Sequence, residues 1–543
     1  MHKKLLSTLL LLLPLITFSQ EKGLDEKIND WFMPKAVWWE SLILSAVPIA
    51  GYNIPIVLIL LVGGATFFTI YFSFPSITKF SLAINTVRGK YDEIEGHGLE
   101  KNEIFVDEEG DIPDTIRDEG EQGEVSHFQA LATAVSGTVG LGNIAGVAVA
   151  IATGGPGATF WMIVCGILGM STKFVECTLG VSYREVTADG TVHGGPMYYL
   201  SRALKEKKLA GLGKILGGLF AILCVGASFG GGNAFQSNQA TVQIISLFNA
   251  EGQASGFIIG LIIATLVGVV IIGGIKRIAS ITEKIVPFMA VLYVLASLII
   301  IFAHFKHIDD AFSLIFSSAF TPMAGLGGFL GVLIVGFQRA AFSNEAGAGS
   351  AAIAHSAVKT KYPASEGVVA LLEPFIDTVL ICTMTALVII FFNMEGDNMQ
   401  HVFTYGAIEG SSVKLNETGQ LLGGVDLTSM AFDDVLPGFS YVLTVAIVLF
   451  AFSTMISWSY YGLQSWKYLF GKGKAADIIY KILFLTFVVI GAAATLDAVI
   501  KFSDAMILAL VFPNMIGLLI LFPNVKRQLN KYLKAIKKDK ATA

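Results

Sequence analysis

Eleven long apolar stretches constrain this chain more than any other feature, because each can cross the roughly 30 Å hydrocarbon core of a bilayer. The stretches cover approximately residues 46–72, 128–151, 158–181, 213–248, 256–274, 281–302, 327–349, 366–392, 437–461, 482–500 and 504–522. Only 15% of the 543 residues are charged, whereas a soluble chain needs about a quarter to cover its surface. The sequence therefore predicts an all-α polytopic membrane protein.

Charge and cysteine usage argue against several classes of function. The net charge of -5 comes without a basic domain, so a nucleic-acid partner is not expected. CxxC, HExxH and calcium-loop patterns are absent, which leaves no structural metal or cofactor to predict. The cysteines all lie inside apolar stretches, where we interpret them as small buried hydrophobes rather than disulfides: Cys165, Cys177, Cys224 and Cys382.

The N-terminus has the parts of a secretory signal: two lysines, an apolar run over 5–16, and small or polar residues up to Ser19. We predict a cleaved signal over residues 1–19, and the alternative is a short uncleaved anchor. Cleavage would leave the mature N-terminus outside, and successive crossings would then place the basic loops and the basic tail, 523–543, inside. Lysine and arginine do concentrate in these loops and in the tail, so we expect an inner (plasma) membrane protein with a cytoplasmic C-terminus.

The crossings divide into one leading helix and two sets of five. The leading helix belongs to a segment over 20–127, which also holds an acidic cytoplasmic insertion near 88–124 of no assignable role. The other ten helices form one set over 128–303 and another over 304–522. An odd number of helices per set inverts the second set relative to the first. Transporters built this way form their sites at the midplane, where corresponding helices are broken.

The first helix of each set carries residues suited to such a break. Between Ser136 and Asn143 the first set is dense in glycine, with polar side chains interspersed. In the second set, charged and polar residues over 339–345 precede Gly347 and Gly349. The alternative is that these glycines only allow helices to pack closely. We interpret the run from Ser136 as an unwound turn, because dense glycine lowers the cost of leaving the helix.

An unwound turn at the membrane midplane is tolerated only where its N–H and C=O groups line a cavity or meet a ligand. N–H donors near Gly142 and Asn143, at the start of the continuing half-helix, suit a carboxylate. Carbonyl groups of the same turn suit a sodium ion or an ammonium group. Because the turn has no acid or base, the predicted ligand is a zwitterion with an uncharged side chain.

Five collinear motifs between residues 128 and 522 resemble the alanine or glycine:cation symporter family: FQALATAVSGTVGLGNIAG, HGGPMYY, AFSNEAGAGSAAIAH, EPFIDTVLICTMTAL and AFSTMISWSYYG. The resemblance implies a leucine-transporter-type fold of two inverted five-helix repeats plus one preceding helix, about eleven transmembrane helices in all. It also implies symport of alanine or glycine with sodium into the cell by alternating access. Leu141 departs from the VGTGN pattern frequent in the family and would remove one hydroxyl contact.

Carried over by motif, the resemblance implies a substrate pocket and a sodium site. The pocket would comprise Gly140, Gly142, Asn143, Gln236, Thr454, Met455 and Trp458. The oxygen ligands of sodium would be Thr138, Ser453 and Ser457. Two alternatives remain open: an amide such as Gln236 also serves to bond neighbouring helices, and Met455 and Trp458 also suit ordinary packing.

Charged residues inside apolar stretches are seldom incidental, because a charge in hydrocarbon costs at least about 2.5 kcal/mol. Arg339 and Glu345 are expected to form an internal pair or gate. Glu373 and Asp377 lie one helical turn apart and suit either a proton relay or structural pairing, of which pairing is favoured. His355 is expected to be solvated or to cap a helix.

The main alternative function is a proton-coupled carrier of small amino acids, which would use one of these carboxylates in place of a sodium site. A passive channel is less favoured, because the sequence has no repeated filter or charged ring. An enzyme is not expected, because the eight histidines form no catalytic or metal-binding set. The sequence leaves open which of alanine, glycine and serine is carried and whether D-enantiomers are accepted. It also leaves open the stoichiometry of ion to substrate and the oligomeric state.

Overall fold

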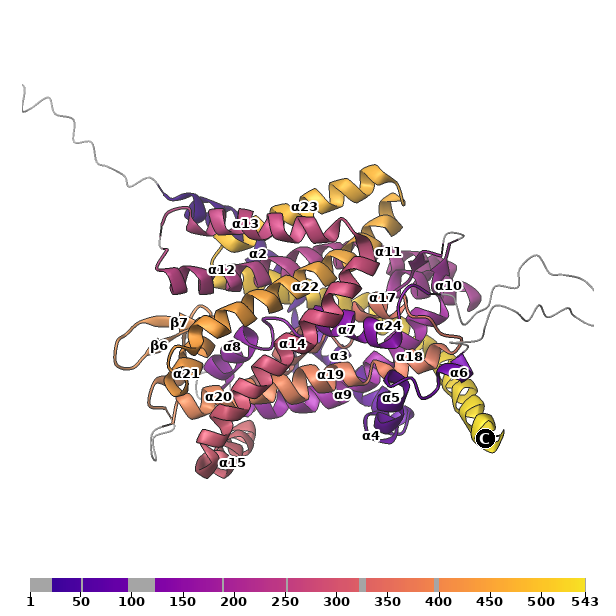
Figure 1. The fold of residues 1–543 in the computed structure, drawn as a ribbon, viewed down its shortest axis with the longest axis horizontal. Helices are drawn as coiled ribbons and strands as arrows, with labels where there is room; N and C mark the ends of the chain where they lie inside the picture. The colour runs from indigo at the N-terminus through magenta and orange to yellow at the C-terminus, as the bar shows by residue number, and fades with distance from the viewer. Residues whose placement is uncertain are drawn as a thin grey trace, which may run out of the picture.

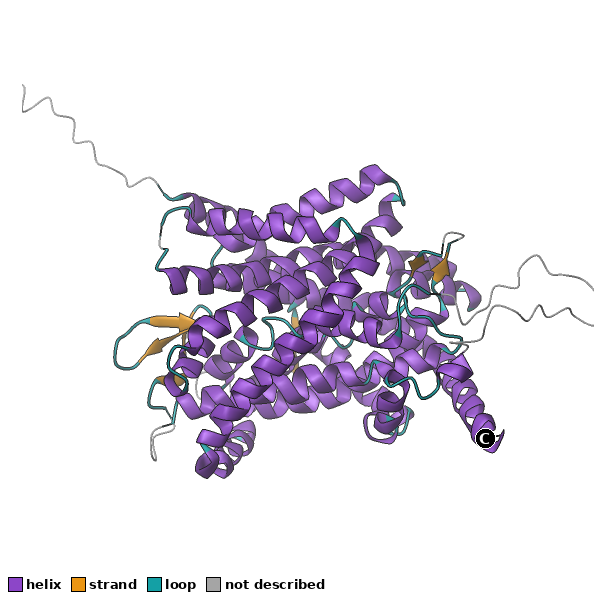
Figure 2. Cartoon of the chain, viewed as in Figure 1, coloured by secondary structure: helices purple, strands orange, loops and turns teal. Residues whose placement is uncertain are grey.

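The computed structural model describes residues 22–49, 52–95, 123–187, 190–250, 252–321, 329–394 and 400–542. Long helices make up most of this part of the chain, and the few strands are short (Figures 1 and 2). The predicted signal over 1–19 and most of the acidic insertion, 96–122, lie outside the described residues.

The N-terminal segment holds one apolar helix, α3 (Ile56–Tyr71), where a crossing over 46–72 was predicted. The start of that prediction is wrong, because β1 (Ala46–Ile49) and β2 (Tyr52–Pro55) pair there as antiparallel strands. Pro48 and Pro55 have no N–H group to extend a helix there. The other helices of this segment are α2 (Leu24–Ile43), α4 (Pro75–Thr78), α5 (Phe80–Val87) and α6 (Asp92–Glu95).

The first set of five begins with an interrupted helix and includes a second helix with a π-helical segment. Its members are α7 (His127–Thr138) with α8 (Ala145–Gly154), α9 (Gly157–Ser182), α11 (Ala210–Phe229) with η1 (Gly230–Ala234) and α12 (Phe235–Phe248), α13 (Ser255–Ile271) and α14 (Gly274–Ala303). Short elements connect them: β3 (Glu185–Val186), β4 (Val192–His193) and α10 (Pro196–Glu206).

The second set repeats this order, again beginning with an interrupted helix. Its members are α16 (Phe329–Asn344) with α17 (Ala351–His355), α18 (Pro363–Val369) with α19 (Leu372–Pro374), η3 (Phe375–Cys382) and α20 (Thr383–Phe392), α22 (Phe439–Phe470), α23 (Lys474–Ala493) and α24 (Leu496–Thr542). The connecting elements are η2 (Phe305–His307), α15 (Ile308–Phe320), β5 (Phe403–Glu409), β6 (Ser412–Leu415), β7 (Leu421–Gly423) and α21 (Val425–Val435).

One predicted boundary in the second set is wrong. The crossing expected over 482–500 spans the end of α23 at Ala493 and the start of α24 at Leu496. Ala494 is extended, with ψ of 162°, and the Thr495 hydroxyl accepts a bond from the Ala498 N–H, as a helix-capping side chain does. A hydropathy profile does not detect this break, because the helices on both sides of it are apolar.

Seven helical spans in the described part of the chain are long and apolar enough to cross a membrane, and α3, α8 and α13 are shorter apolar helices. The two sets of five, each opened by an interrupted helix and preceded by α3, confirm the predicted fold class.

The interrupted helix α7/α8 lies inside the bundle, where every residue from 130 to 152 is buried. The long helix α22 crosses the middle of Figure 1 and contacts α7, α11, α12 and α14. Helix α9 packs against α16 and α18 on the other side of the break. The interrupted backbone is therefore buried, which is stable only if other groups satisfy its N–H and C=O groups.

Candidate functional site

The first interrupted helix leaves helical geometry at the predicted place. Helix α7 ends at Thr138, residues 139–144 form turns, and α8 begins at Ala145. Glycine is required at position 140 in particular, because a Cβ there would lie 2.4 Å from Thr454 Oγ1 and 3.0 Å from Gln236 Oε1. The predicted interruption is confirmed, although the first residues of the predicted run, from Ser136, remain helical.

The second interrupted helix also breaks where the sequence predicted. Helix α16 ends at Asn344 and α17 begins at Ala351. Between them Glu345, Gly347 and Gly349 have φ of 55°, 94° and 81°, in the left-handed region that glycine adopts most readily. The strained residue is Glu345, because it is the one of the three that carries a side chain.

The turn over 139–144 is held by backbone hydrogen bonds, such as Asn143 N–H to the Gly140 carbonyl at 3.2 Å, and by two side chains. The Leu141 N–H donates to Gln236 Oε1 at 3.0 Å, and the Gly140 N–H donates to Asn143 Oδ1 at 3.1 Å. The Gly142 N–H makes no hydrogen bond to any described residue. Two predicted pocket residues, Gln236 and Asn143, therefore hold the turn in shape and leave one buried donor available.

Helix α22 supplies the opposite wall of the turn. Thr454 Oγ1 donates to the Ser136 carbonyl at 2.9 Å, and Trp458 Nε1 donates to the Gly137 carbonyl at 3.2 Å. Met455 is buried on the same helix. The ring of Phe342 closes another side, since a Cβ at Gly142 would lie 3.1 Å from it. Most of the predicted pocket thus gathers around residues 136–143, and its binding role stays a prediction.

Comparison with known proteins identifies the family. Residues 40–543 match the sodium:alanine symporter family. The chain belongs to this family. It is 39% identical to the sodium/alanine symporter of Methanococcus maripaludis over 86% of this chain and 92% of that protein.

Two further relatives agree. An uncharacterized transporter of Haemophilus influenzae is 37% identical over 78% of this chain and 86% of its own length. The sodium/proton-dependent alanine carrier protein of Bacillus sp. strain PS3 is 33% identical over 77% of this chain and 90% of its own length. The resemblance seen in the five motifs is confirmed, and the chain is a multi-pass membrane protein of a transporter family.

In this member of the sodium:alanine symporter family, the predicted sodium ligands do not all face one another. Ser457 Oγ lies 3.0 Å from Ser136 Oγ, which itself donates to the Ser453 carbonyl at 2.8 Å. The Thr138 hydroxyl instead bonds back to carbonyls of its own helix, Ala134 at 3.3 Å and Val135 at 3.4 Å. Ser136 therefore joins α7 to α22, a role that sequence reasoning did not assign to it.

The expected pair of Arg339 and Glu345 is wrong. Arg339 pairs with Asp504 of α24, whereas Glu345 Oε1 accepts a bond from Trp458 Nε1 at 3.0 Å. The cause is the left-handed turn at Glu345, which follows the end of α16 and turns its carboxylate toward α22 and Ser350. The sequence carries no signal for this choice, because Asp504 is 165 residues away from Arg339 in the chain.

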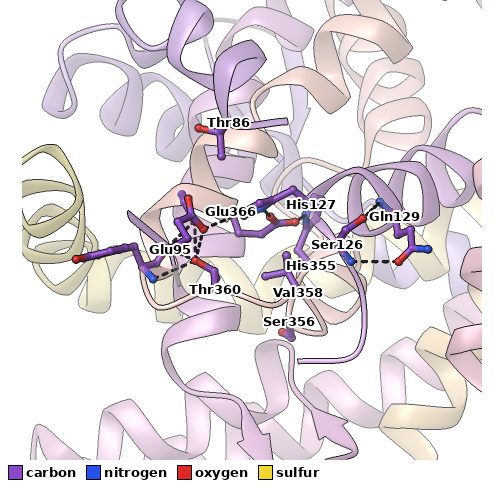
Figure 3. Close-up of polar contacts among 12 residues, drawn as sticks. Thr86, Glu95, Ser126, His127, Gln129, His355, Ser356, Val358, Thr360 and Glu366 are labelled. Carbon is purple, nitrogen blue, oxygen red and sulfur yellow. Dashed lines mark hydrogen bonds and ion pairs between the residues drawn. The ribbon is translucent and has the colours of Figure 1, made fainter. Parts of the chain in front are cut away.

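A buried polar cluster lies at the start of α7. We call it the His127 cluster, and it consists of Glu95, His127, His355, Thr360 and Glu366 (Figure 3). His127 lies between two carboxylates, 2.8 Å from Glu95 Oε2 and in contact with Glu366. The other oxygen of Glu366 pairs with His355, which is fully buried. The expectation that His355 is solvated or capping is therefore wrong, because it is paired in the core with the carboxylate of Glu366 from α18.

The two carboxylates one turn apart on α19 and η3 differ in their partners. Glu373 Oε1 accepts from Lys173 Nζ at 2.9 Å, and both side chains are fully buried. Asp377 instead contacts hydroxyl groups of Ser343 and Thr378. The favoured interpretation, structural pairing, therefore holds for Glu373 alone.

Proposed function

We propose that this protein is a secondary active transporter that carries a small neutral amino acid, alanine or glycine, into the cell together with sodium by alternating access. The observation that carries the proposal is the buried turn over 139–144, where Gln236 of α12 accepts from the Leu141 N–H and the Gly142 N–H bonds no described residue. The printed names of two relatives, a sodium/alanine symporter and a sodium/proton-dependent alanine carrier, support the same class of substrate.

The turn suits the carboxylate of an amino acid. The Gly142 N–H precedes the N-terminal end of α8, where the helix dipole favours negative charge. The proposed pocket is Gly140, Gly142, Asn143, Gln236, Thr454, Met455 and Trp458. Met455 and Trp458 are buried on α22, which favours a substrate with a short side chain, and no acid or base lies within the turn itself.

The proposed sodium ligands are Thr138, Ser453 and Ser457, with Ser136 next to them. One sodium provides enough driving force: a tenfold gradient adds about 1.4 kcal/mol and 100 mV adds about 2.3 kcal/mol, equal to roughly 500-fold accumulation. Sodium is cargo here, and no resident cofactor is proposed.

Membrane placement is also a proposal. The lysines and arginines concentrate in alternate loops, which supports a multi-pass inner-membrane protein with the N-terminus outside and the C-terminus in the cytoplasm. The proposed repeats span 128–303 and 304–522, preceded by the segment over 20–127 and followed by the basic tail 523–543.

A proton-coupled carrier is the second candidate. The name of the Bacillus relative includes the proton, and Asp377 is a buried carboxylate without a paired cation. Such a carrier would keep the same pocket and move its ion site to that carboxylate.

The deciding experiment is uptake of labelled alanine and glycine into proteoliposomes under an inward sodium gradient, with choline replacement and a separate proton gradient. Sodium-dependent accumulation is expected. Uptake that follows only the proton gradient would reject sodium coupling in favour of the second candidate.

Pocket variants extend this test. Gln236→Ala removes the acceptor of the Leu141 N–H, and an unpaired buried group costs about 1–3 kcal/mol, so alanine affinity should fall roughly fivefold to over a hundredfold. Asn143→Ala should act similarly. The matched control is Gln243→Ala, two turns along α12, where the amide bonds Ser429 and Thr444 rather than the turn. Wild-type affinity in Gln236→Ala and Asn143→Ala would remove both residues from the pocket.

A further inference from the structure

The last helix, α24, carries a basic face where it leaves the apolar bundle. Its cations follow one another at spacings of four, three and four residues, which places them on one side of an α-helix: Arg527, Lys531, Lys534 and Lys538. We call these four residues the basic face, and all four are exposed. Arg527, Lys531 and Lys534 form no ion pair with any described residue. Most of this charge is therefore not neutralised within the described part of the chain.

The opposite side of the same helical segment packs against the protein. Its apolar residues repeat at the same spacings and are buried: Val525, Leu529, Tyr532 and Ile536. The Tyr532 hydroxyl donates to Glu95 Oε1 at 3.1 Å, in the His127 cluster. These contacts fix the rotation of the helix about its axis, so the basic face points away from the bundle. Figure 1 shows this end of α24 projecting from the other helices.

The side of α24 that becomes basic is apolar and exposed earlier in the helix. Ile516 is 39% exposed and lies within the predicted crossing over 504–522. Arg527 follows it by about three helical turns, and therefore on the same side of the helix. Exposed apolar side chains of a membrane protein contact acyl chains. A helix side that contacts the acyl chains of one leaflet meets the headgroups of that leaflet where it emerges.

Aromatic and apolar side chains beside the exit of α24 mark the level of the headgroups. Lys526 Nζ lies 5.7 Å from the ring centroid of Tyr71 and 5.8 Å from that of Phe72, at the end of α3. Tyrosine is enriched at the membrane–water interface, and lysine side chains near helix ends extend toward it. The segment after α3 also exposes Phe74 and Ile77, at 51% and 75%, which suits contact with lipid. The basic face therefore begins beside the headgroups.

We propose that the basic face of α24 binds the headgroups of anionic phospholipids in the leaflet where the helix emerges. This inference goes beyond the proposed function, because it does not depend on which substrate or ion the protein carries. Phosphate oxygens accept hydrogen bonds from guanidinium and ammonium groups, and a basic surface attracts lipids that carry a net negative charge.

The arrangement of the basic face favours a lipid surface over other carriers of phosphate. Its cations extend along roughly 16 Å of helix, which suits a layer of headgroups better than one small anion. A nucleic acid also presents a row of phosphates, but it would not cover the exposed apolar side chains that precede the basic face. An anionic bilayer covers both parts with one partner.

Lipid bound to the basic face should also stabilise the fold. Tyr532 lies on the other side of the same turns, and Glu95, which accepts its hydrogen bond, pairs with His127 at 2.8 Å. A headgroup that holds Arg527 and Lys531 therefore favours the position in which α24 packs against the start of α7. Phosphatidylglycerol should raise the thermal midpoint of the wild-type protein more than the zwitterionic phosphatidylcholine does.

The test titrates the full chain in a neutral detergent with phosphatidylglycerol or phosphatidylcholine and counts the bound lipids by native mass spectrometry. The wild-type protein should bind phosphatidylglycerol about tenfold or more tightly, because each basic residue near the headgroups adds to the attraction. This preference should be lost when the whole basic face is neutralised by Arg527→Gln, Lys531→Gln, Lys534→Gln and Lys538→Gln. A matched control, which should keep the preference, neutralises four exposed lysines elsewhere: Lys205→Gln, Lys207→Gln, Lys208→Gln and Lys214→Gln.

Four outcomes would overturn the proposal. The first is equal wild-type affinity for the two lipids, and the second is a wild-type preference in the basic-face variant. The third is an equal loss in the control variant, which would assign the binding to net charge rather than to the basic face. The fourth is displacement of phosphatidylglycerol by inorganic phosphate at equal concentration, which would make the face a phosphate site.

If the basic-face variant does not fold, Lys534→Cys locates the helix instead. The four natural cysteines are buried, so a thiol-reactive fluorophore labels position 534 selectively. In proteoliposomes, quenching of this fluorophore by a headgroup-labelled lipid should be stronger in vesicles that contain phosphatidylglycerol than in phosphatidylcholine alone. Equal quenching in the two kinds of vesicle would show that the basic face does not seek anionic headgroups, and would overturn the proposal.

Discussion

Gly232→Ala should damage the substrate turn through a tryptophan rather than through any direct contact with it. Gly232 lies in the π-helical segment η1, and a Cβ there would be 2.2 Å from Cγ of the buried Trp458 ring. Carbon atoms in contact prefer about 3.5–4.0 Å, so the indole would have to move by more than about 1 Å.

The magnitude follows from what the indole holds. If Trp458 stays in place, overpacking costs about 1–3 kcal/mol. If it moves, it loses its bonds to the Gly137 carbonyl at 3.2 Å and the Glu345 carboxylate at 3.0 Å. Those bonds contribute about 1 and about 1.5–3 kcal/mol. The variant adopts the less costly arrangement, so we expect a loss of about 1–3 kcal/mol.

The assay compares alanine half-saturation and the thermal midpoint in detergent with those of Gly218→Ala. Gly218 lies in the preceding helix α11 with open space around its Cβ position, so this control adds the same methyl group without a clash. Gly232→Ala should raise the alanine half-saturation roughly fivefold to a hundredfold and lower the midpoint, since about 1.4 kcal/mol corresponds to tenfold. Identical behaviour of the two variants would refute the reasoning.

Two further predictions concern buried polar partners. Lys173→Met should leave Glu373 without its lysine and with only His355 Nε2, 3.5 Å away, as an ion-pair partner among the described residues, at a cost of about 3–5 kcal/mol, so little folded protein should reach the membrane; adding Glu373→Gln should recover most of it, as measured by detergent size-exclusion chromatography. Ser136→Ala should remove the bonds to the Ser453 carbonyl and the Ser457 hydroxyl, about 1 kcal/mol each, and raise half-saturating sodium roughly tenfold or more at a maintained maximal rate. An unchanged sodium dependence in Ser136→Ala would show that Ser136 of α7 does not support the sodium site.

The sequence predicted the interrupted helices well, because the residues that permit a break are local. Dense glycine between Ser136 and Asn143 lowers the cost of leaving the helix, and polar side chains supply the bonds that the backbone loses. The hairpin before α3 was missed, because 46–55 is apolar in either structure and hydropathy does not distinguish them. The break between α23 and α24 was misplaced for the same reason.

Side-chain partners were less predictable, because they depend on packing between distant helices. An ion pair of Arg339 with Glu345 was expected because they are close in the chain. The left-handed turn at Glu345 separates them, and Arg339 pairs with Asp504 instead. His355 follows a motif rich in small residues and was expected near solvent, whereas Glu366 meets it inside the core. Proximity in sequence is a poor guide to ion pairs wherever the backbone leaves the helix.

The different partners of Glu373 and Asp377 could not be predicted from the sequence and are seen only in the structure. Both lie in the motif EPFID, one turn apart, and nothing local distinguishes a structural carboxylate from one that binds a transported ion. A transported cation must leave its site in every cycle, so that site cannot keep a lysine whose ammonium would compete with the ion. Lys173 lies 2.9 Å from Glu373 and therefore excludes that carboxylate from ion transport. The carboxylate of Asp377 instead accepts hydrogen bonds from the hydroxyls of Ser343 and Thr378, and no lysine, arginine or histidine in the described part of the chain pairs with it.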